Sequence, residues 1–167
     1  MTDEKLTQKW AVAAFFGDLP LGYEFPREET PLHATLAGVF AINKSGDEIA
    51  GLLEQCLTDT TGFSVRGLAE ERWGDELIVT RLEDLQQFSA LYAGVQDCLL
   101  NKGAIFNEPQ YLHDGFTPHV THQKEGKLSV GESARINRVS LVDMFPGGDG
   151  YRRRIHATIS LEEENAR

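Results

Sequence analysis

The sequence predicts an α+β fold in which antiparallel β-sheets carry helices on their outer faces. Several short segments alternate apolar and polar residues, which is typical of half-buried strands, and two longer segments repeat apolar residues at helical spacing. In the order of these segments, β-β-α-β-β-α-β-β-β, each helix is preceded and followed by two or three strands, which is typical of the α+β class. Neither a linker nor a low-complexity stretch interrupts the 167 residues, so we expect one domain over residues 1–167.

The first half of the chain begins with two predicted strands. Residues 8–17 are rich in Ala, Val and Phe and end at a Gly-Asp-Leu-Pro turn, and residues 32–42 form the second strand. We expect a loop at residues 21–31, which contain two prolines and three glutamates. Ser45-Gly46-Asp47-Glu48 fits a capping box. The first helix is predicted from the apolar residues that follow this box at helical spacing, namely Ile49, Leu52, Leu53, Cys56 and Leu57.

The second half contains the remaining predicted elements. Residues 62–74 and 76–82 predict a pair of strands around a tight turn. Residues 84–101 predict the second helix, because one face is apolar and Lys-Gly follows as an end signal. Three further strands are predicted at residues 118–123, 134–145 and 151–161, with a glycine-rich turn between the last two.

The net charge of −10 excludes extended, non-specific binding to nucleic acid, because the phosphate backbone supplies that affinity through many Lys and Arg contacts. The excess acid is confined to one part of the chain. Residues 1–100 carry 7 Lys and Arg against 17 Asp and Glu, whereas residues 101–167 carry 9 of each. A small or terminal phosphate substrate remains compatible with this distribution.

The N-terminal segment is acidic, and no long apolar run follows it, so we expect neither a signal peptide nor a membrane span. A cytoplasmic location and a monomeric state are the corresponding expectations. Cys56 and Cys98 lie within the apolar repeats of the two predicted helices. We therefore interpret them as free, buried thiols rather than as a disulfide or metal ligands.

Two histidine-threonine motifs carry the functional prediction. They are His33-Ala34-Thr35 and His119-Val120-Thr121, whose histidines are 86 residues apart in opposite halves of the chain. On a strand, residues i and i+2 point to the same side, so each motif presents an imidazole and a hydroxyl on one face. A third match, His156-Ala157-Thr158, shares the C-terminal part with the second motif, and we therefore prefer the first two as the functional pair.

An imidazole can donate or accept a proton near neutral pH, and a threonine hydroxyl can bind a phosphate oxygen. Two such units facing each other would form a phosphate site with its own acid and base. We therefore expect His33 and His119 to lie on strands of two different sheets and to face one cleft.

The two motifs resemble those of the 2H phosphoesterase superfamily, which includes the 2′-5′ RNA ligase-like proteins and the 2′,3′-cyclic nucleotide phosphodiesterases. The segment Gly115-Phe116-Thr117-Pro118-His119-Val120-Thr121 is the closest match, because members often carry an aromatic residue and a proline before the second motif. Arg138-Val139-Ser140-Leu141-Val142 resembles the strand that follows. The similarity extends from about Trp10 to Leu161.

This resemblance implies two pseudo-symmetric lobes of antiparallel β-sheet, each contributing one motif to a central cleft. The chain departs from the family pattern after the second motif. Residues 123–133 form a short polar stretch where many members place a helix, which predicts a trimmed second lobe.

The preferred hypothesis is a metal-independent phosphodiesterase without a cofactor, active in RNA processing. It would hydrolyse a 2′,3′-cyclic phosphate or a 2′-5′ phosphodiester of a nucleotide or an RNA end. His33 and His119 would be the general acid and base, in an order that the sequence leaves open, while Thr35 and Thr121 would bind phosphate oxygens.

Further residues are candidates for contacts in the cleft. Arg154 and His156 could reach the substrate phosphate, although their alternating pattern is more typical of an ordinary half-buried terminal strand. Tyr111 and Phe116 could stack a base or simply pack in the core. His122 falls on the opposite face from the motif before it, and we interpret it as structural.

Two alternatives remain open. The first is a binding module of the same fold that holds a nucleotide or RNA terminus without turnover. The second is a metal-assisted hydrolase that uses His113, Asp114 and His119, although the chain contains no second set of ligands at a typical spacing.

Overall fold

The computed structural model describes residues 7–162, so the acidic segment on which the expectation of no signal peptide depends lies outside the described residues. Two short 3-10 helices, η3 (Pro109–Tyr111) and η4 (His113–Gly115), lie in the loop before the second motif. The strands and α-helices, in chain order, are β1 (Trp10–Phe15), β2 (Glu24–Pro26), β3 (His33–Ala41), α1 (Gly46–Cys56), β4 (Phe63–Trp73), β5 (Leu77–Leu82), α2 (Gln86–Asn101), β6 (Ile105–Phe106), β7 (His119–Thr121), β8 (Ser133–Ile136), β9 (Arg138–Asp143) and β10 (Arg152–Ser160).

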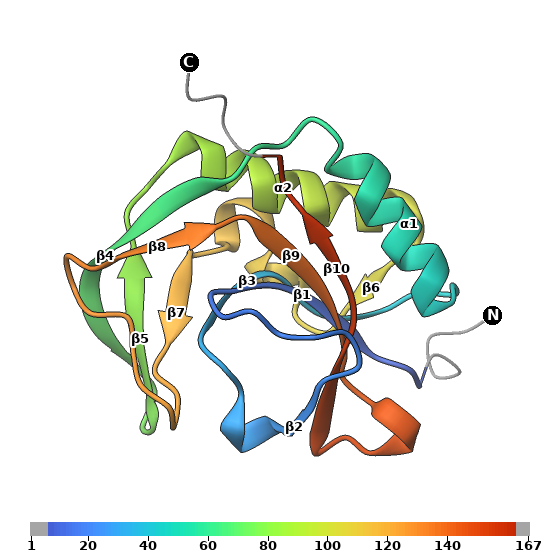
Figure 1. Cartoon of the computed structure of the whole chain (residues 1–167), viewed down its shortest axis with the longest axis horizontal. Coiled ribbons are helices and arrows are strands. Elements are labelled where there is room, and N and C mark those ends of the chain that lie inside the picture. Colours follow the sequence, from blue (N-terminus) through green and yellow to red (C-terminus); the bar gives the residue numbers. More distant parts are fainter. Residues whose placement is uncertain (1–6, 163–167) are drawn as a thin grey trace.

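These strands form one continuous antiparallel sheet in the order β2-β10-β9-β1-β3-β7-β5-β4-β8. The short strand β6 pairs with the C-terminal end of β3. Both helices lie on the same side of the sheet (Figure 1), where α1 packs on β9 and β10 while α2 packs on β3. Strands β2, β10, β9, β1 and β3 form one half of the sheet, and β7, β5, β4 and β8 form the other. The prediction of an α+β fold with antiparallel strands is thus confirmed.

The helix face of the sheet holds the main hydrophobic core. The capping box forms as predicted, since the Glu48 amide donates to Ser45 Oγ at 3.1 Å and the Ser45 amide donates to Glu48 Oε1 at 2.9 Å. Behind this cap, Ile49 and Leu53 of α1 are fully buried. They pack with buried residues of β3 and β7 that include Ala34 and Val120. Because Ala34 and Val120 face the helices, the residues on either side of each face the opposite surface.

Three parts of the chain differ from the sequence prediction. The predicted loop at residues 21–31 contains β2, which pairs with β10. This pairing buries Phe25 in a small apolar cluster on the face of the sheet away from the helices, which we call the open face. The short strand β6 was also not predicted. The single strand predicted at residues 134–145 is two strands: β8 pairs with β4, whereas β9 pairs with β1 and β10. This segment therefore connects the two halves of the sheet.

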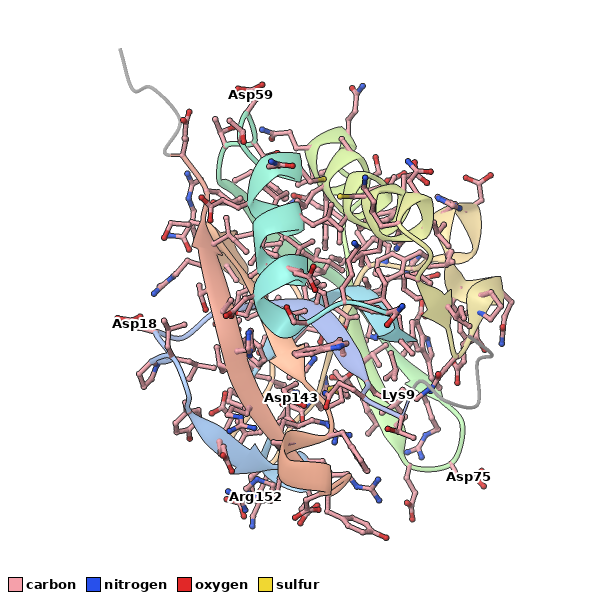
Figure 2. The ribbon with its side chains drawn as sticks, turned by 90° about the vertical axis from the view of Figure 1, so that its right-hand side faces the viewer. Lys9, Asp18, Asp59, Asp75, Asp143 and Arg152 are labelled. Carbon is pink, nitrogen blue, oxygen red and sulfur yellow. The ribbon has the colours of Figure 1, made fainter. Side chains whose placement is uncertain are left out.

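Among residues 7–162, neither helix combines the length with the apolar character that crossing a bilayer requires. The tip of the β4–β5 hairpin, marked by Asp75, and the segment after α1, marked by Asp59, lie at opposite ends of the molecule (Figure 2). The hairpin tip thus lies away from the helices and borders the open face.

Candidate active site

The two histidine-threonine motifs lie side by side on neighbouring strands. In the antiparallel pair β3–β7, Ala34 is opposite Val120. This register sets His33 opposite Thr121 and Thr35 opposite His119, all on the face away from the helices. Such cross-strand neighbours have Cβ atoms about 4.5–5.5 Å apart, and diagonal neighbours such as the two histidines are about 7–8 Å apart.

The prediction that the motifs lie on two different sheets is therefore wrong. The two halves of the molecule share one sheet, and β3 and β7 are the hydrogen-bonded strands at which the halves meet. The sequence pattern reports which face each motif occupies, but strand pairing across 86 residues is a long-range property. The expectation that both motifs share one surface agrees with the register.

Each imidazole is oriented by a backbone carbonyl two residues before it. His33 Nδ1 lies 2.9 Å from the Pro31 oxygen, and His119 Nδ1 lies 2.7 Å from the Thr117 oxygen. Since a carbonyl oxygen can only accept, Nδ1 carries the proton in both rings. Nε2 is then the atom available to substrate, an acceptor in the neutral ring and a donor in the charged one.

An aromatic ring packs against each imidazole. Phe15, the cross-strand partner of His33 on β1, has its ring centroid 5.1 Å from the imidazole centroid. Trp73, at the end of β4, has its ring centroid 4.4 Å from that of His119. These contacts restrict the rotamers of both histidines and shield one side of each ring from water.

Both histidines have a lowered pKa. Burial lowers the pKa of His33 below its ordinary value, and the nearby charge of His119 lowers it further. The hydrogen bond to Pro31 raises this pKa and offsets part of the effect. Burial also lowers the pKa of His119, against the hydrogen bond to Thr117. The charge of one ring thus opposes protonation of the other, as expected for two titratable groups that share a site.

Three adjoining hollows line the open face around the motifs. The His33 hollow includes Phe15, Phe25, Thr30, His33, Thr35 and Arg153. The central hollow includes Thr35, Gly38, Val39, Glu108, Tyr111 and Phe116. The His119 hollow, with a volume of about 650 Å³, includes Trp73, Leu77, Glu108, Tyr111, Thr117 and His119. Since neighbouring hollows share residues, they form one groove that contains both histidines.

The aromatic residues named from the sequence reach this groove. Tyr111 lines both the central hollow and the His119 hollow, and Phe116 lines the central hollow while packing on Tyr92 with ring centroids 4.4 Å apart. Both belong to the loop around η3 and η4, which approaches the sheet beside β3.

Arg154 and His156, predicted to contact the cleft, point elsewhere. Arg154 Nη2 lies 3.4 Å from Asp143 Oδ2, and its Nη1 lies 3.7 Å from Glu24 Oε2. Asp143 is labelled near the centre of Figure 2. His156 Nε2 lies 3.0 Å from Asp47 Oδ1 at the start of α1, and its ring packs edge-on against Trp10. The structure therefore contradicts the possible cleft contacts of this pair and agrees with the structural interpretation of the terminal strand.

A register shift in β10 explains this error. Between Ile155 and Ala157 the pairing with β9 advances by one residue, which is the pattern of a β-bulge. Before the shift, Ile155 faces the open side, and after it Ala157 packs toward the main core. Alternation read through such a bulge assigns the wrong face, so Arg153 lies in the groove in place of Arg154.

Arg153, which the sequence analysis did not select, lines the His33 hollow. Its Nη1 donates to the carbonyls of Gly150 at 2.9 Å and Met144 at 3.1 Å. Burial lowers the pKa of its guanidinium, and the charge of Arg27 adds to this effect. Spacing of two residues from the apolar Ile155 is the sequence signal that would have placed it correctly.

Gln96 is a second residue that the sequence analysis missed. Its side chain is fully buried on α2, where Nε2 donates to the Leu36 oxygen of β3 at 3.0 Å and Oε1 accepts from the His113 amide at 2.8 Å. It therefore ties the loop that carries Tyr111 to the strand that carries the first motif. An amide between apolar positions of a predicted helix was the available signal.

The remaining histidines have partners away from the groove. His113 Nε2 lies 2.5 Å from Asp97 Oδ1, and His122 Nε2 lies 3.1 Å from Thr80 Oγ1. His122 thus lies on the opposite face, as predicted. Within the described part of the chain, no three His, Cys, Asp or Glu side chains group in a way that could hold a metal ion. The set His113, Asp114 and His119 does not form a site.

Neither a protein-family model nor a curated protein matches this sequence. Solved structures do match its fold. One described as a phosphoesterase has a TM-score of 0.60 and 16% identity, covering 93% of this chain and 99% of its own. E. coli LigT complexed with 3′-AMP has a TM-score of 0.58 and 14% identity, with 93% and 99% covered. The protein TT0787 of Thermus thermophilus has a TM-score of 0.58 and 17% identity, with 94% and 100% covered.

The chain therefore has the fold of the 2H phosphoesterases, to which LigT belongs. The resemblance drawn from the two short motifs is confirmed at the level of the fold, and it extends over nearly the whole chain.

Proposed function

We propose that the protein is a metal-independent phosphodiesterase acting on a 2′,3′-cyclic phosphate or a 2′-5′ linkage of a nucleotide or an RNA end. The single observation that best supports this proposal is the antiparallel register of β3 with β7, in which each histidine is opposite the threonine of the other motif. Two histidines at diagonal positions, which are about 7–8 Å apart between paired strands, would leave room for one phosphorus atom between their rings.

The surroundings of the two rings suggest their roles. Burial lowers the pKa of both rings, and the charge of His119 further opposes protonation of His33, so only one ring would be charged at a time. We assign the neutral form to His33, which lies in the smaller of the two hollows. His33 would act as the general base and His119 as the general acid. A bound phosphate anion favours the charged form of the imidazole that acts as the general acid.

In the proposed step, His33 Nε2 takes a proton from water, and the resulting oxygen nucleophile attacks phosphorus. The bond from phosphorus to one ribose oxygen breaks, and that oxygen takes the proton from His119 Nε2, giving a 2′- or 3′-monophosphate. The hydroxyls of Thr35 and Thr121 would donate to the non-bridging oxygens, where charge accumulates in the transition state.

The groove suggests how a nucleotide would bind. Trp73 and Tyr111 line the His119 hollow and offer flat apolar surfaces to a base. E. coli LigT has been crystallised with 3′-AMP, NADP+, ATP and phosphate, which supports nucleotide binding by this fold. All the proposed site residues come from one chain, so a monomer suffices for the reaction.

The test is a panel of 2′,3′-cyclic mononucleotides, 2′-5′ dinucleotides and cyclic-phosphate RNA ends, assayed with and without a strong chelator. We expect turnover that persists in chelator and is lost in the His33→Ala variant. Binding without turnover would favour a non-catalytic module of the same fold. Turnover abolished by chelator and restored by metal would favour a metal-assisted hydrolase.

A further inference from the structure

Glu108 is an exposed acidic residue that lines the groove together with aromatic residues. It lines both the central hollow and the His119 hollow, the second together with Tyr111, Trp73 and His119. Within residues 7–162, its carboxylate has neither a hydrogen-bond nor an ion-pair partner. An exposed carboxylate at the edge of a ligand-sized hollow is available to accept hydrogen bonds from a ligand.

The backbone conformation around η3 fixes the position of Glu108 beside the groove. Glu108 directly precedes Pro109, whose ring fixes one backbone dihedral, and the Glu108 carbonyl accepts the Tyr111 amide at 3.1 Å. The first turn of η3 therefore holds Glu108 and Tyr111 together at the rim of the His119 hollow. A base that stacks on Tyr111 would present its edge to the carboxylate.

An ionised carboxylate accepts hydrogen bonds and donates none. Guanine presents two adjacent donor groups, N1–H and N2–H₂, which match the two carboxylate oxygens. Adenine and cytosine present a donor beside a ring-nitrogen acceptor, and uracil presents one N–H between two carbonyl oxygens, so each of these would set a lone pair against the carboxylate. Hydrogen-bond chemistry thus separates guanine from the other three bases.

We infer that Glu108 makes the His119 hollow a guanine-selective subsite, with the base stacked beside Trp73 and Tyr111. This inference rests on the proposed function, because it assigns the hollow to the base of the nucleotide whose phosphate lies at His33 and His119. His119 itself lines the hollow, so base and phosphate would occupy adjoining parts of one groove.

The test measures binding of 3′-GMP, 3′-AMP, 3′-CMP and 3′-UMP to the full chain by tryptophan fluorescence and by calorimetry. The chain has two tryptophans, and Trp10 is only 4% exposed beside His156, so quenching by a stacked base reports Trp73. We expect 3′-GMP to bind most tightly, by on the order of 10-fold, since a hydrogen bond to a charged group is worth about that factor. The Trp73→Phe variant should lose the quenching.

Glu108→Gln is the decisive variant, because it keeps the shape of the side chain but replaces one acceptor by a donor. It should weaken 3′-GMP binding on the order of 10-fold while leaving 3′-AMP within about 2-fold or tighter, since an amide matches adenine. Glu54→Gln is the matched control, because Glu54 is exposed on α1 and the charge change is the same. Its nucleotide affinities should equal those of the wild type.

Equal affinities for the four nucleotides, an absence of binding by all of them, or an unchanged ranking in Glu108→Gln would each overturn the inference. Turnover of the four 2′,3′-cyclic mononucleotides separates this outcome from failure of the proposed function. Guanine-selective binding without any turnover would refute only the phosphodiesterase activity. Turnover without base preference would refute only the guanine subsite.

Discussion

Replacing Gln96 by leucine should destabilise the protein and weaken substrate binding at the same time. The side chain joins two backbone groups, the Leu36 oxygen on β3 and the His113 amide in the loop that carries Tyr111. Leucine has a similar volume and retains the packing of α2, so the change removes the two hydrogen bonds with little loss of contact.

The expected magnitude follows from the burial of each partner. Leaving a buried polar group unpaired costs about 1–3 kcal/mol. This cost applies to the oxygen of Leu36, which is fully buried, whereas His113 is exposed and its amide can form a hydrogen bond with water instead. Burying an apolar side chain in place of the amide offsets about 1–2 kcal/mol. The hydrogen bond lost at the His113 amide adds about 0.5–1.5 kcal/mol, so after the offset we expect the free energy of unfolding to fall by about 1.5 kcal/mol, within a range of roughly 0–3.

Urea unfolding followed by circular dichroism measures this change, and KM for a cyclic-phosphate substrate reports the looser Tyr111 loop. Gln87→Leu is the matched control, since Gln87 is an exposed glutamine of the same helix. That variant should remain within about 0.5 kcal/mol of the wild type. Equal stability of the Gln96 and Gln87 variants, with equal KM values, would refute the bridging role of Gln96.

The remaining predictions concern the proposed catalytic residues. Because the pKa values of His33 and His119 are both lowered, kcat/KM should be bell-shaped with its limbs on the acidic side of about 6.5 and within about two units of it, and a flat profile would contradict paired histidines. Ala at either histidine should lower kcat roughly 10²–10⁴-fold, and the double variant much less than the product of the two, whereas His156→Ala should retain turnover because that ring contacts Asp47. Thr35→Ala or Thr121→Ala should cost roughly 0.5–1.5 kcal/mol of transition-state binding, measured on the same substrate.

Local patterns in the sequence predicted much of the site. Two-residue alternation placed His33 and Thr35 on one face, and the capping box placed the start of α1. The pairing of β3 with β7 could not be read in this way, because it depends on contacts between segments far apart in the chain. The β10 bulge could not be predicted for a related reason. The extra residue between Ile155 and Ala157 exchanges the two faces of the strand, so Arg153 rather than Arg154 lies in the groove, and the sequence itself does not indicate the bulge.

The register of the two motifs also indicates which groups would set the direction of the proposed reaction. With Ala34 opposite Val120, the two motifs are related by a local twofold axis, and a phosphate on this axis meets one histidine and one threonine from each side. The four side chains alone therefore do not distinguish the attacking oxygen from the leaving one. The asymmetry lies around them: Phe15 and Arg153 border His33, whereas His119 opens into the hollow lined by Trp73. Binding of the base in that hollow would direct the leaving ribose oxygen toward His119, so substrate orientation and acid-base assignment are determined together.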